Sequence, residues 1–377
     1  MRFLTADYLY PLHTLPIKEG VLQISDSGEV ISIFNKRSQV GSNRLEVYSG
    51  ILCPGFVNTH CHLELSHLID AIPRKSGLTT FIKKIKQIRN TNDKLKISAI
   101  LNAHNSMIKN GIVGVGDIAN TSDSFFIKDQ NDIIYHTFIE LFSLNASLAD
   151  QVFKSGMHLF KKCPIPSSIT PHATYSVSNR LYSKIAKFNK GAPLTIHNQE
   201  SKYENKLFSK GGGKLYDLIS TFGKIDITGK TALVSTLLNL PKEAPLILVH
   251  NIYTDNEDVK WASEHQYNIY YCTCPKANLY IEGRLPDYSI FNIDRLCVGT
   301  DSLASNNNLS IIEELEIIQA NSKFDLNTLL KIASKNGAEA LGFKDLGTFK
   351  KGKKPGINLI ETKNNRLQKN TKIKVLV

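Results

Sequence analysis

The middle of the chain, residues 55 to about 340, alternates short apolar runs with longer amphipathic stretches. Short apolar runs bounded by turn residues are typical of buried β-strands. Eight of them predict strands at 55–61, 111–117, 132–140, 167–173, 193–199, 245–251, 268–274 and 295–301. Helices are predicted at 79–90, 97–109, 147–161, 178–189, 257–265, 310–320 and 326–340. Strands that alternate with helices in this way predict an α/β fold, a (β/α)8 TIM barrel.

Both ends of the chain show a different pattern, in which short alternating segments are separated by turns. Residues 20–36 predict a hairpin that turns around Asp26–Gly28. Because both ends have β character, we expect them to pair into one small domain made of residues 1–54 and 341–377. The catalytic barrel is then assigned to residues 55–340.

One connection inside the predicted barrel, residues 201–244, is unusually long. Long insertions of this kind often form lids. Its Gly211–Gly213 run is not followed by the Lys-Ser/Thr pair of a phosphate-binding loop, so it predicts a hinge or a turn.

Composition and charge narrow the class of protein. The 377 residues are 42% hydrophobic and 21% charged, which is ordinary for a globular protein. The net charge is +12, but the lysines are dispersed and no nucleic-acid motif accompanies them. No apolar run reaches the length of a membrane span, no signal peptide is recognisable, and six cysteines form no disulfide framework. We therefore expect a cytoplasmic protein with no nucleic-acid or membrane partner.

Polar residues gather where the predicted strands end. His60 and His62 are two residues apart at the end of the first strand, so their side chains share one face. The other strand-end residues are His172, His197 with Glu200, His250 and Asp301. The carboxyl ends of all barrel strands meet at one face, where active sites lie. Histidines and carboxylates delivered there by five strands predict a metal-dependent active site.

Six stretches give the chain a family resemblance. They are PGFVNTHCHLE, TPHATYSVS, IHNQES, VHN, CPKANLYI and VGTDSLASNNNLSIIEEL. In this order they resemble the amidohydrolase superfamily, in its branch of cytosine/adenosine/guanine deaminase-like and chlorohydrolase-like enzymes. The stretch HLELSHL resembles aminodeoxyfutalosine deaminases. The resemblance implies a barrel with a composite β-sandwich built from the two chain ends.

The resemblance also implies a metal and a mechanism. The implied ligands of one divalent ion, zinc or iron, are His60, His62, His197 and Asp301. Three imidazoles and a carboxylate independently favour a transition metal over calcium or magnesium. No lysine stands at the end of the fourth strand, which favours one metal over two. Glu200 is implied to shuttle protons, while His250 and Asp301 orient a metal-bound hydroxide that attacks the amine-bearing carbon of a heterocycle and releases ammonia.

Three more residues are candidates for substrate binding. The resemblance implies that His172 contacts the substrate. Glu64 is interpreted either as a ligand of a substrate amine or hydroxyl or as a structural carboxylate, and Ser302 either as a substrate contact or as a turn former. Asn278 is expected to shape a loop, and we expect structural roles for His67, His104, His136, His158 and His265.

The substrate class implied is an aminopurine or its nucleoside, aminodeoxyfutalosine included. Chlorohydrolase activity and ring-opening of a cyclic amide, as in imidazolonepropionase-like relatives, stay open. A barrel that only binds a metabolite or a metal is disfavoured because Glu200 and Asp301 are both present. Members of this branch are often dimers or larger, so a homo-oligomer is compatible with the resemblance.

Overall fold

The computed structural model describes residues 1–41, 44–130, 132–189 and 191–377. Its central part contains two four-stranded parallel sheets. One sheet consists of β8 (Phe56–Cys61), β9 (Ile112–Ala119), β10 (Ile134–Leu141) and β11 (Ser167–Pro171). The other consists of β12 (Leu194–Asn198), β13 (Leu246–His250), β14 (Ile269–Thr273) and β15 (Leu296–Val298). All eight predicted strands are therefore present.

The two sheets join at both edges and close into a barrel. Parallel bridges link Ala173 to His197, between β11 and β12, and Cys61 to Asp301, between β8 and β15. The strand order is thus the sequence order around a closed ring. This closed ring of eight parallel strands is the predicted (β/α)8 barrel.

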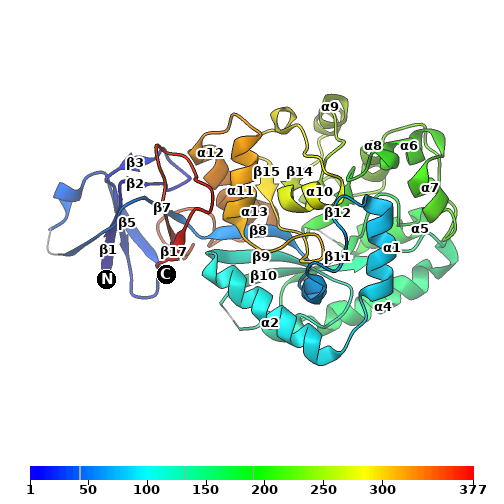
Figure 1. Ribbon diagram of the computed structural model, residues 1–377, viewed down its shortest axis with the longest axis horizontal. Coiled ribbons are helices and arrows are strands. Elements are labelled where there is room, and N and C mark those ends of the chain that lie inside the picture. The colour runs from blue at the N-terminus through cyan, green and yellow to red at the C-terminus, as the bar shows by residue number, and fades with distance from the viewer. Residues whose placement is uncertain (42–43, 131, 190) are drawn as a thin grey trace.

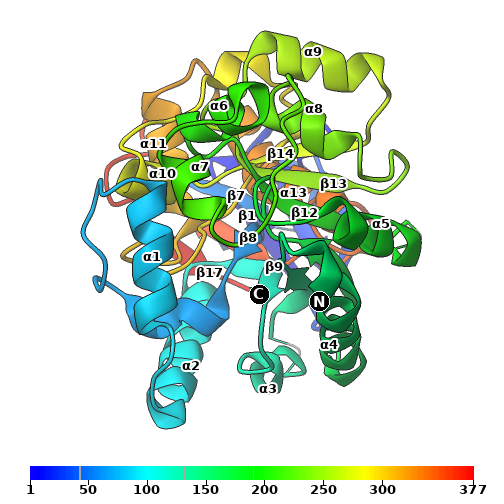
Figure 2. The ribbon, with the colours of Figure 1, turned by 90° about the vertical axis from the view of Figure 1, so that its right-hand side faces the viewer.

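Helices surround the strands, as Figure 2 shows in a view along the barrel. They are α1 (Leu78–Ile88), α2 (Asp93–Lys109), α3 (Phe125–Lys128), α4 (Ala149–Lys162), α5 (Asn179–Phe188), α9 (Asn256–Glu264), α10 (Pro275–Ile281), α11 (Ile311–Ala320), α12 (Leu326–Leu330) and α13 (Asn336–Leu341). The predicted single helix 326–340 is divided, because a π-helical turn at Lys331–Lys335 separates α12 from α13. The short helices α3 and α10 were not predicted, since each follows a strand without an amphipathic repeat long enough to detect.

The long connection 201–244 contains three short helices. They are α6 (Lys202–Lys210), α7 (Lys214–Ile219) and α8 (Ala232–Leu237). Gly211 ends α6 with φ +63° and Gly213 begins α7 with φ +99°, values that glycine adopts at little cost. The glycine run is therefore a turn between two helices, which was one of the two predicted alternatives.

The chain ends form two sheets at one side of the barrel, where both termini lie (Figure 1). The order of one sheet is β5 (Val30–Phe34), β4 (Val21–Ile24), β1 (Arg2–Thr5) and β6 (Leu45–Val47). The order of the other is β17 (Ile373–Val375), β16 (Ile357–Ile360), β7 (Ile51–Pro54), β2 (Tyr8–Leu9) and β3 (Ile17–Lys18). The antiparallel pairing of β16 with β7 joins the C-terminal segment to the N-terminal one, and the β4–β5 hairpin is present as predicted.

Among the described residues, no helix combines the length and the apolar character needed to cross a membrane.

Candidate active site

Four candidate metal ligands converge at the carboxyl ends of the strands. His60 lies on β8 and His62 just beyond it, and their Nε2 atoms are 3.1 Å apart. Asp301 Oδ1 lies 3.6 Å from His60 Nε2 and 3.4 Å from His62 Nε2. One ligand atom each of His60, His62 and His197 lies within 4.8 Å of the others. The four side chains that the sequence singled out as ligands thus surround one point.

Close packing of β15 against β8 brings Asp301 to this point. A Cβ atom on Gly299 would lie only 2.7 Å from the carbonyl oxygen of His60, so only glycine allows this approach. The backbone N–H groups of Thr300 and Asp301 both donate to that carbonyl, each at 3.1 Å. The contact places the Asp301 carboxylate beside the imidazole of His60.

The other polar atoms of His197 and Asp301 form hydrogen bonds within the protein, which leaves the atoms at the shared point available for a metal. His197 Nδ1 donates to the His172 carbonyl oxygen at 2.6 Å, so its Nε2 carries the lone pair. Ser305 Oγ donates to Asp301 Oδ2 at 2.6 Å, which leaves Oδ1 for the shared point. Outer contacts of this kind fix the orientation of metal ligands.

Burial favours the neutral imidazoles of His62 and His197, and the neutral imidazole is the form that binds a metal. Burial, with the nearby His60, lowers the pKa of His62 to about 3. Burial also lowers the pKa of His197 well below its ordinary value. Burial alone would raise the pKa of Asp301, but the hydrogen bond to His60 and the adjacent imidazoles bring it below its ordinary value. Three imidazoles and one carboxylate fit a divalent transition metal.

Glu200 and His250 lie next to these ligands. Glu200 follows β12 and is 4% exposed, and burial raises its pKa well above the ordinary value. His250 ends β13 with its Nε2 3.8 Å from Glu200 Oε2. Its Nδ1 donates to Asn278 Oδ1 at 2.8 Å, and burial lowers its pKa to about 4. A protonatable carboxyl and a neutral imidazole with an available Nε2 therefore face each other beside the ligand cluster.

The backbone around Glu200 is held by a second buried glutamate, Glu204. Its Oε1 accepts the backbone N–H groups of Glu200 at 2.7 Å and Ser201 at 3.0 Å. Its Oε2 accepts the N–H of Gln199 at 3.0 Å and the hydroxyl of Thr174 at 2.7 Å. Together with Ser201, Glu204 forms a capping box at the start of α6.

The three predicted substrate-binding residues are placed differently from one another. The His172 ring lies 4.9 Å from the His197 ring, at the same face. The Glu64 carboxylate is bound by Arg89, Asn120 and Thr121 and is 3% exposed. Ser302 Oγ lies 3.4 Å from Ser305 Oγ, and it is Ser305 that contacts Asp301.

Several residues of the site were missed from the sequence. Glu140 lies one residue before the end of β10, and a search for carboxylates at strand ends would have found it. Ser305, Asn120 and Glu204 act through loop or helix geometry, which leaves no strand-end signal. Asn278, expected to shape a loop, instead lies in α10 and bonds His250.

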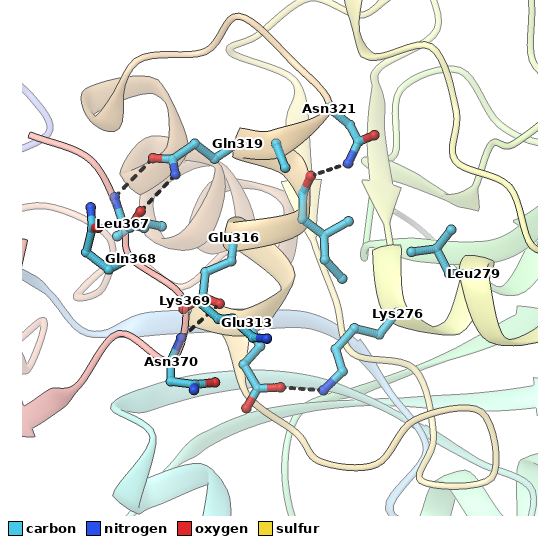
Figure 3. A pocket seen from close by; sticks show the side chains of 12 residues that line it. Lys276, Leu279, Glu313, Glu316, Gln319, Asn321, Leu367, Gln368, Lys369 and Asn370 are labelled. Atoms are coloured by element: carbon cyan, nitrogen blue, oxygen red, sulfur yellow. Dashed lines mark hydrogen bonds and ion pairs between the residues drawn. The ribbon is translucent and has the colours of Figure 1, made fainter.

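Two cavities lie outside the ligand cluster. One of about 760 Å³ is lined by Tyr175, Tyr182, Phe208, Phe222 and neighbouring residues of the 201–244 connection. Another, of about 510 Å³, lies between α11 and the segment 367–370 (Figure 3). Its wall contains the ion pair of Lys276 with Glu313, at 2.7 Å. Neither is lined by the converging histidines.

Most of this chain matches one known protein family. The family described as "Amidohydrolase family" matches residues 51–377. The chain belongs to the amidohydrolase family. The family is metal-dependent, and in this amidohydrolase a histidine cluster of the required kind is present. The predicted family resemblance is thereby confirmed.

Two relatives show which enzymes this amidohydrolase is similar to. It is 25% identical over 331 residues to the aminodeoxyfutalosine deaminase of a Nitratiruptor species, an alignment that covers 83% of this chain and 79% of the relative. It is 26% identical over 361 residues to the 5'-deoxyadenosine deaminase of Methanococcus vannielii, with coverage of 86% and 79%.

Solved structures agree at the level of the fold. The Helicobacter pylori aminofutalosine deaminase in complex with methylthio-coformycin matches with a TM-score of 0.82 at 18% identity, covering 97% of this chain and 93% of that chain. An adenosine deaminase from Xanthomonas campestris with bound zinc matches with a TM-score of 0.77 at 18% identity, covering 95% and 84%.

Proposed function

We propose that this amidohydrolase is a metal-dependent deaminase of an amino-substituted heterocycle, an aminopurine nucleoside such as aminodeoxyfutalosine. The observation that carries the proposal is the placement of Glu200 and His250, 3.8 Å apart, beside the cluster of three histidines and Asp301. The names of the relatives, which are deaminases of adenosine-like nucleosides, support the same reaction class.

The metal of the proposal is one zinc or iron ion held by His60, His62, His197 and Asp301. When bound, such an ion lowers the pKa of a coordinated water to about 7 and so supplies a nucleophile at neutral pH. The neutral state of His62 and His197 suits this role, because a protonated imidazole offers no lone pair.

Glu200 moves the protons of the reaction. It accepts a proton from the attacking water and donates it to the ring nitrogen next to the amine-bearing carbon. The tetrahedral carbon then carries both a hydroxyl and an amino group. Proton transfer from the hydroxyl to the amino group releases ammonia and leaves a carbonyl. The raised pKa of Glu200 suits a group that must both take and return a proton near neutral pH.

His250 orients the water. Because Asn278 Oδ1 accepts the Nδ1–H, the Nε2 atom of His250 is an acceptor directed at the space beside Glu200. His172, close to the His197 ring, is assigned to substrate binding. Glu64 and Ser302 keep their predicted assignment as substrate-binding residues, with the Glu64 carboxylate held by Arg89, Asn120 and Thr121.

We keep the cytoplasmic location and the small-molecule partner that the sequence predicts. A homo-oligomer is the assembly that the family resemblance implies. Chlorohydrolase and cyclic amide hydrolase reactions use the same water and the same proton shuttle. They differ in their products, because a chlorohydrolase releases chloride, a cyclic amide hydrolase forms a ring-opened acid, and neither releases ammonia.

The experiment measures ammonia release by zinc- and iron-loaded protein from adenosine, 5'-deoxyadenosine, methylthioadenosine, aminodeoxyfutalosine, adenine and guanine. We expect rapid release from at least one nucleoside, loss of activity on chelation, and at least a roughly 1,000-fold lower kcat in Glu200→Gln with unchanged metal content. The exposed Glu243 provides a control, since Glu243→Gln should act like the wild type. Metal-loaded protein that releases no ammonia from any compound would refute deamination.

A further inference from the structure

The larger of the two cavities outside the ligand cluster has a volume of about 760 Å³, within the range of small-molecule sites in proteins. It is enclosed by the loop after β10, the segment 174–182 that leads into α5, and parts of the connection 201–244. Among the described residues that line it there is no candidate metal ligand, and neither Glu200 nor His250. The cavity is therefore distinct from the candidate active site.

One short segment forms the wall between this cavity and the active site. His172 lies at the ligand cluster, with its ring 4.9 Å from the His197 ring. Thr174 and Tyr175, two and three residues later, line the cavity, and the Tyr175 ring is 6.1 Å from the His172 ring. The loop between β11 and α5 therefore has the active site on one side and the cavity on the other.

Aromatic side chains give the cavity flat apolar walls. Tyr175, Tyr182 and Phe208 are buried, and Phe222 is 48% exposed. Aromatic faces of this kind pack favourably against other planar rings. A ligand that fills the cavity is therefore expected to contain a flat ring system.

Two buried hydroxyl groups on the cavity wall make no hydrogen bond within the part of the chain that the structure describes. They are Ser178 Oγ and Thr236 Oγ1, in residues that are 8% and 2% exposed. Ser178 is the N-cap residue of α5, yet its hydroxyl does not accept from the first turn, which is the usual role of a serine at that position. A buried hydroxyl without a partner is costly, and each hydroxyl can both donate and accept. The pair therefore fits the polar edge of a ligand.

The charges around the cavity favour an uncharged ligand. Among the described residues that line it, none of the buried ones is charged, and the charged ones, Arg180, Lys224 and Asp226, are exposed. Arg180 is paired with Asp150, and Asn179 Nδ2 donates to Asp226 Oδ2 at 2.7 Å. A charged group in the buried part of the cavity would meet no opposite charge, and burial of an unpaired charge is costly.

Hydrogen bonds connect the cavity wall to Glu200. The hydroxyl of Thr174 donates to Glu204 Oε2 at 2.7 Å, and Glu204 Oε1 accepts the backbone N–H of Glu200 at 2.7 Å. A ligand that shifts the segment 174–178 would act through these bonds on the position of Glu200. Displacement of a reacting group by about 1 Å is enough to change turnover strongly.

We propose that this cavity is a second ligand site, for a neutral planar heterocycle that carries both hydrogen-bond donors and acceptors, and that its occupant changes turnover through Thr174, Glu204 and Glu200. The binding of the heterocycle is independent of the proposed function. The effect on turnover rests on the proposed function, since it acts on the residue that moves the protons.

The test measures binding before turnover. Titration calorimetry on zinc-loaded protein at neutral pH gives dissociation constants for hypoxanthine, which is uncharged, and for urate, a planar anion of similar shape. Thr236→Val keeps the shape of the side chain and removes the hydroxyl, and Phe222→Ala removes one aromatic wall. Thr348→Val is the matched control, because Thr348 Oγ1 is also a buried hydroxyl without a partner among the described residues but lies outside the cavity.

We expect hypoxanthine to bind with a Kd below about 1 mM, and urate to bind at least about 10-fold more weakly. Thr236→Val should weaken hypoxanthine binding about 3- to 10-fold and Phe222→Ala about 10-fold, while Thr348→Val should change it less than about 2-fold. Absence of binding, equal affinity for urate, or an affinity for hypoxanthine that both cavity variants leave unchanged would overturn the inference.

Turnover then separates the cavity from the substrate site. With the best nucleoside, saturating hypoxanthine should change kcat by at least about 2-fold, and Thr236→Val should raise the hypoxanthine concentration needed by the same factor as the Kd. Purely competitive inhibition with an unchanged kcat would place hypoxanthine in the active site and overturn the inference. Protein that binds hypoxanthine as expected but deaminates no nucleoside would refute the proposed function and leave the second ligand site standing.

Discussion

Glu204 allows a test of how the protein positions Glu200, because it bonds the backbone of Glu200 and need not touch the substrate. Four donors converge on its two oxygens at 2.7–3.0 Å, and the side chain has no exposed surface. In Glu204→Gln one oxygen becomes an amide nitrogen that faces two donors. Two charge-assisted hydrogen bonds are lost, at about 1.5–3 kcal/mol each, or about 3–6 kcal/mol together.

An opposing effect reduces this loss. Burial raises the pKa of Glu204 from 4.5 to about 7. At 1.36 kcal/mol per pKa unit, the buried charge costs about 3 kcal/mol at pH 7, and the neutral amide avoids this cost. We therefore expect Glu204→Gln to lower the free energy of unfolding by at most about 3 kcal/mol.

The effect on activity should be larger than the effect on folding suggests. A shift of about 1 Å in the Glu200 backbone is enough for a loss of kcat on the order of 100-fold. Metal content should not change, because the bond of His197 to the His172 carbonyl does not involve Glu204. The assays are urea unfolding, metal analysis and kcat with the best nucleoside, with Glu243→Gln as the control. A Glu204→Gln variant whose kcat stays within about 3-fold of the wild-type value would refute the positioning role. A variant that loses bound metal and activity in parallel would show that the substitution acts on the metal ligands instead.

Three further outcomes follow from particular contacts. Ser305→Ala removes the hydrogen bond to Asp301 Oδ2, so metal affinity in a chelator competition should fall about 10- to 100-fold, and unchanged affinity would contradict this role. Lys128 and Asp117 form a fully buried ion pair with their charged atoms 2.5 Å apart. Lys128→Met leaves the Asp117 charge buried without its partner and should lower the free energy of unfolding by about 3–5 kcal/mol. Adding Asp117→Asn should recover part of this loss. Burial raises the pKa of Glu314 from 4.5 to about 8, so the folded state binds its proton more tightly than the unfolded state. Stability should therefore fall as the pH rises from about 5 to 8, by up to about 5 kcal/mol, and Glu314→Gln should flatten this dependence in urea titrations at several pH values.

Much of the fold was readable from local patterns. Each barrel strand is a short apolar run bounded by turn residues, and each long helix carries an amphipathic repeat, so both are encoded within a few consecutive residues. The divided helix at 326–341 was not readable, because the π-helical turn at Lys331–Lys335 leaves the apolar repeat almost intact. The pairing of β16 with β7 joins segments about 300 residues apart and could be expected only from the β character of both ends.

The residues that converge at the candidate site could be predicted from strand ends alone. His60, His62, His172, His197, His250 and Asp301 all stand at strand ends, and a closed parallel barrel brings all strand ends to one face. The hydrogen-bond partners of the other polar atoms at the site became visible only in the folded chain. Glu64, just after β8, and Glu140, on β10, are both buried acids. Both oxygens of Glu64 accept hydrogen bonds, from Arg89 and Thr121, whereas among the described residues only Oε2 of Glu140 accepts one, from Asn120. Hydrogen-bond saturation depends on neighbours that are distant in sequence, so no local pattern records it.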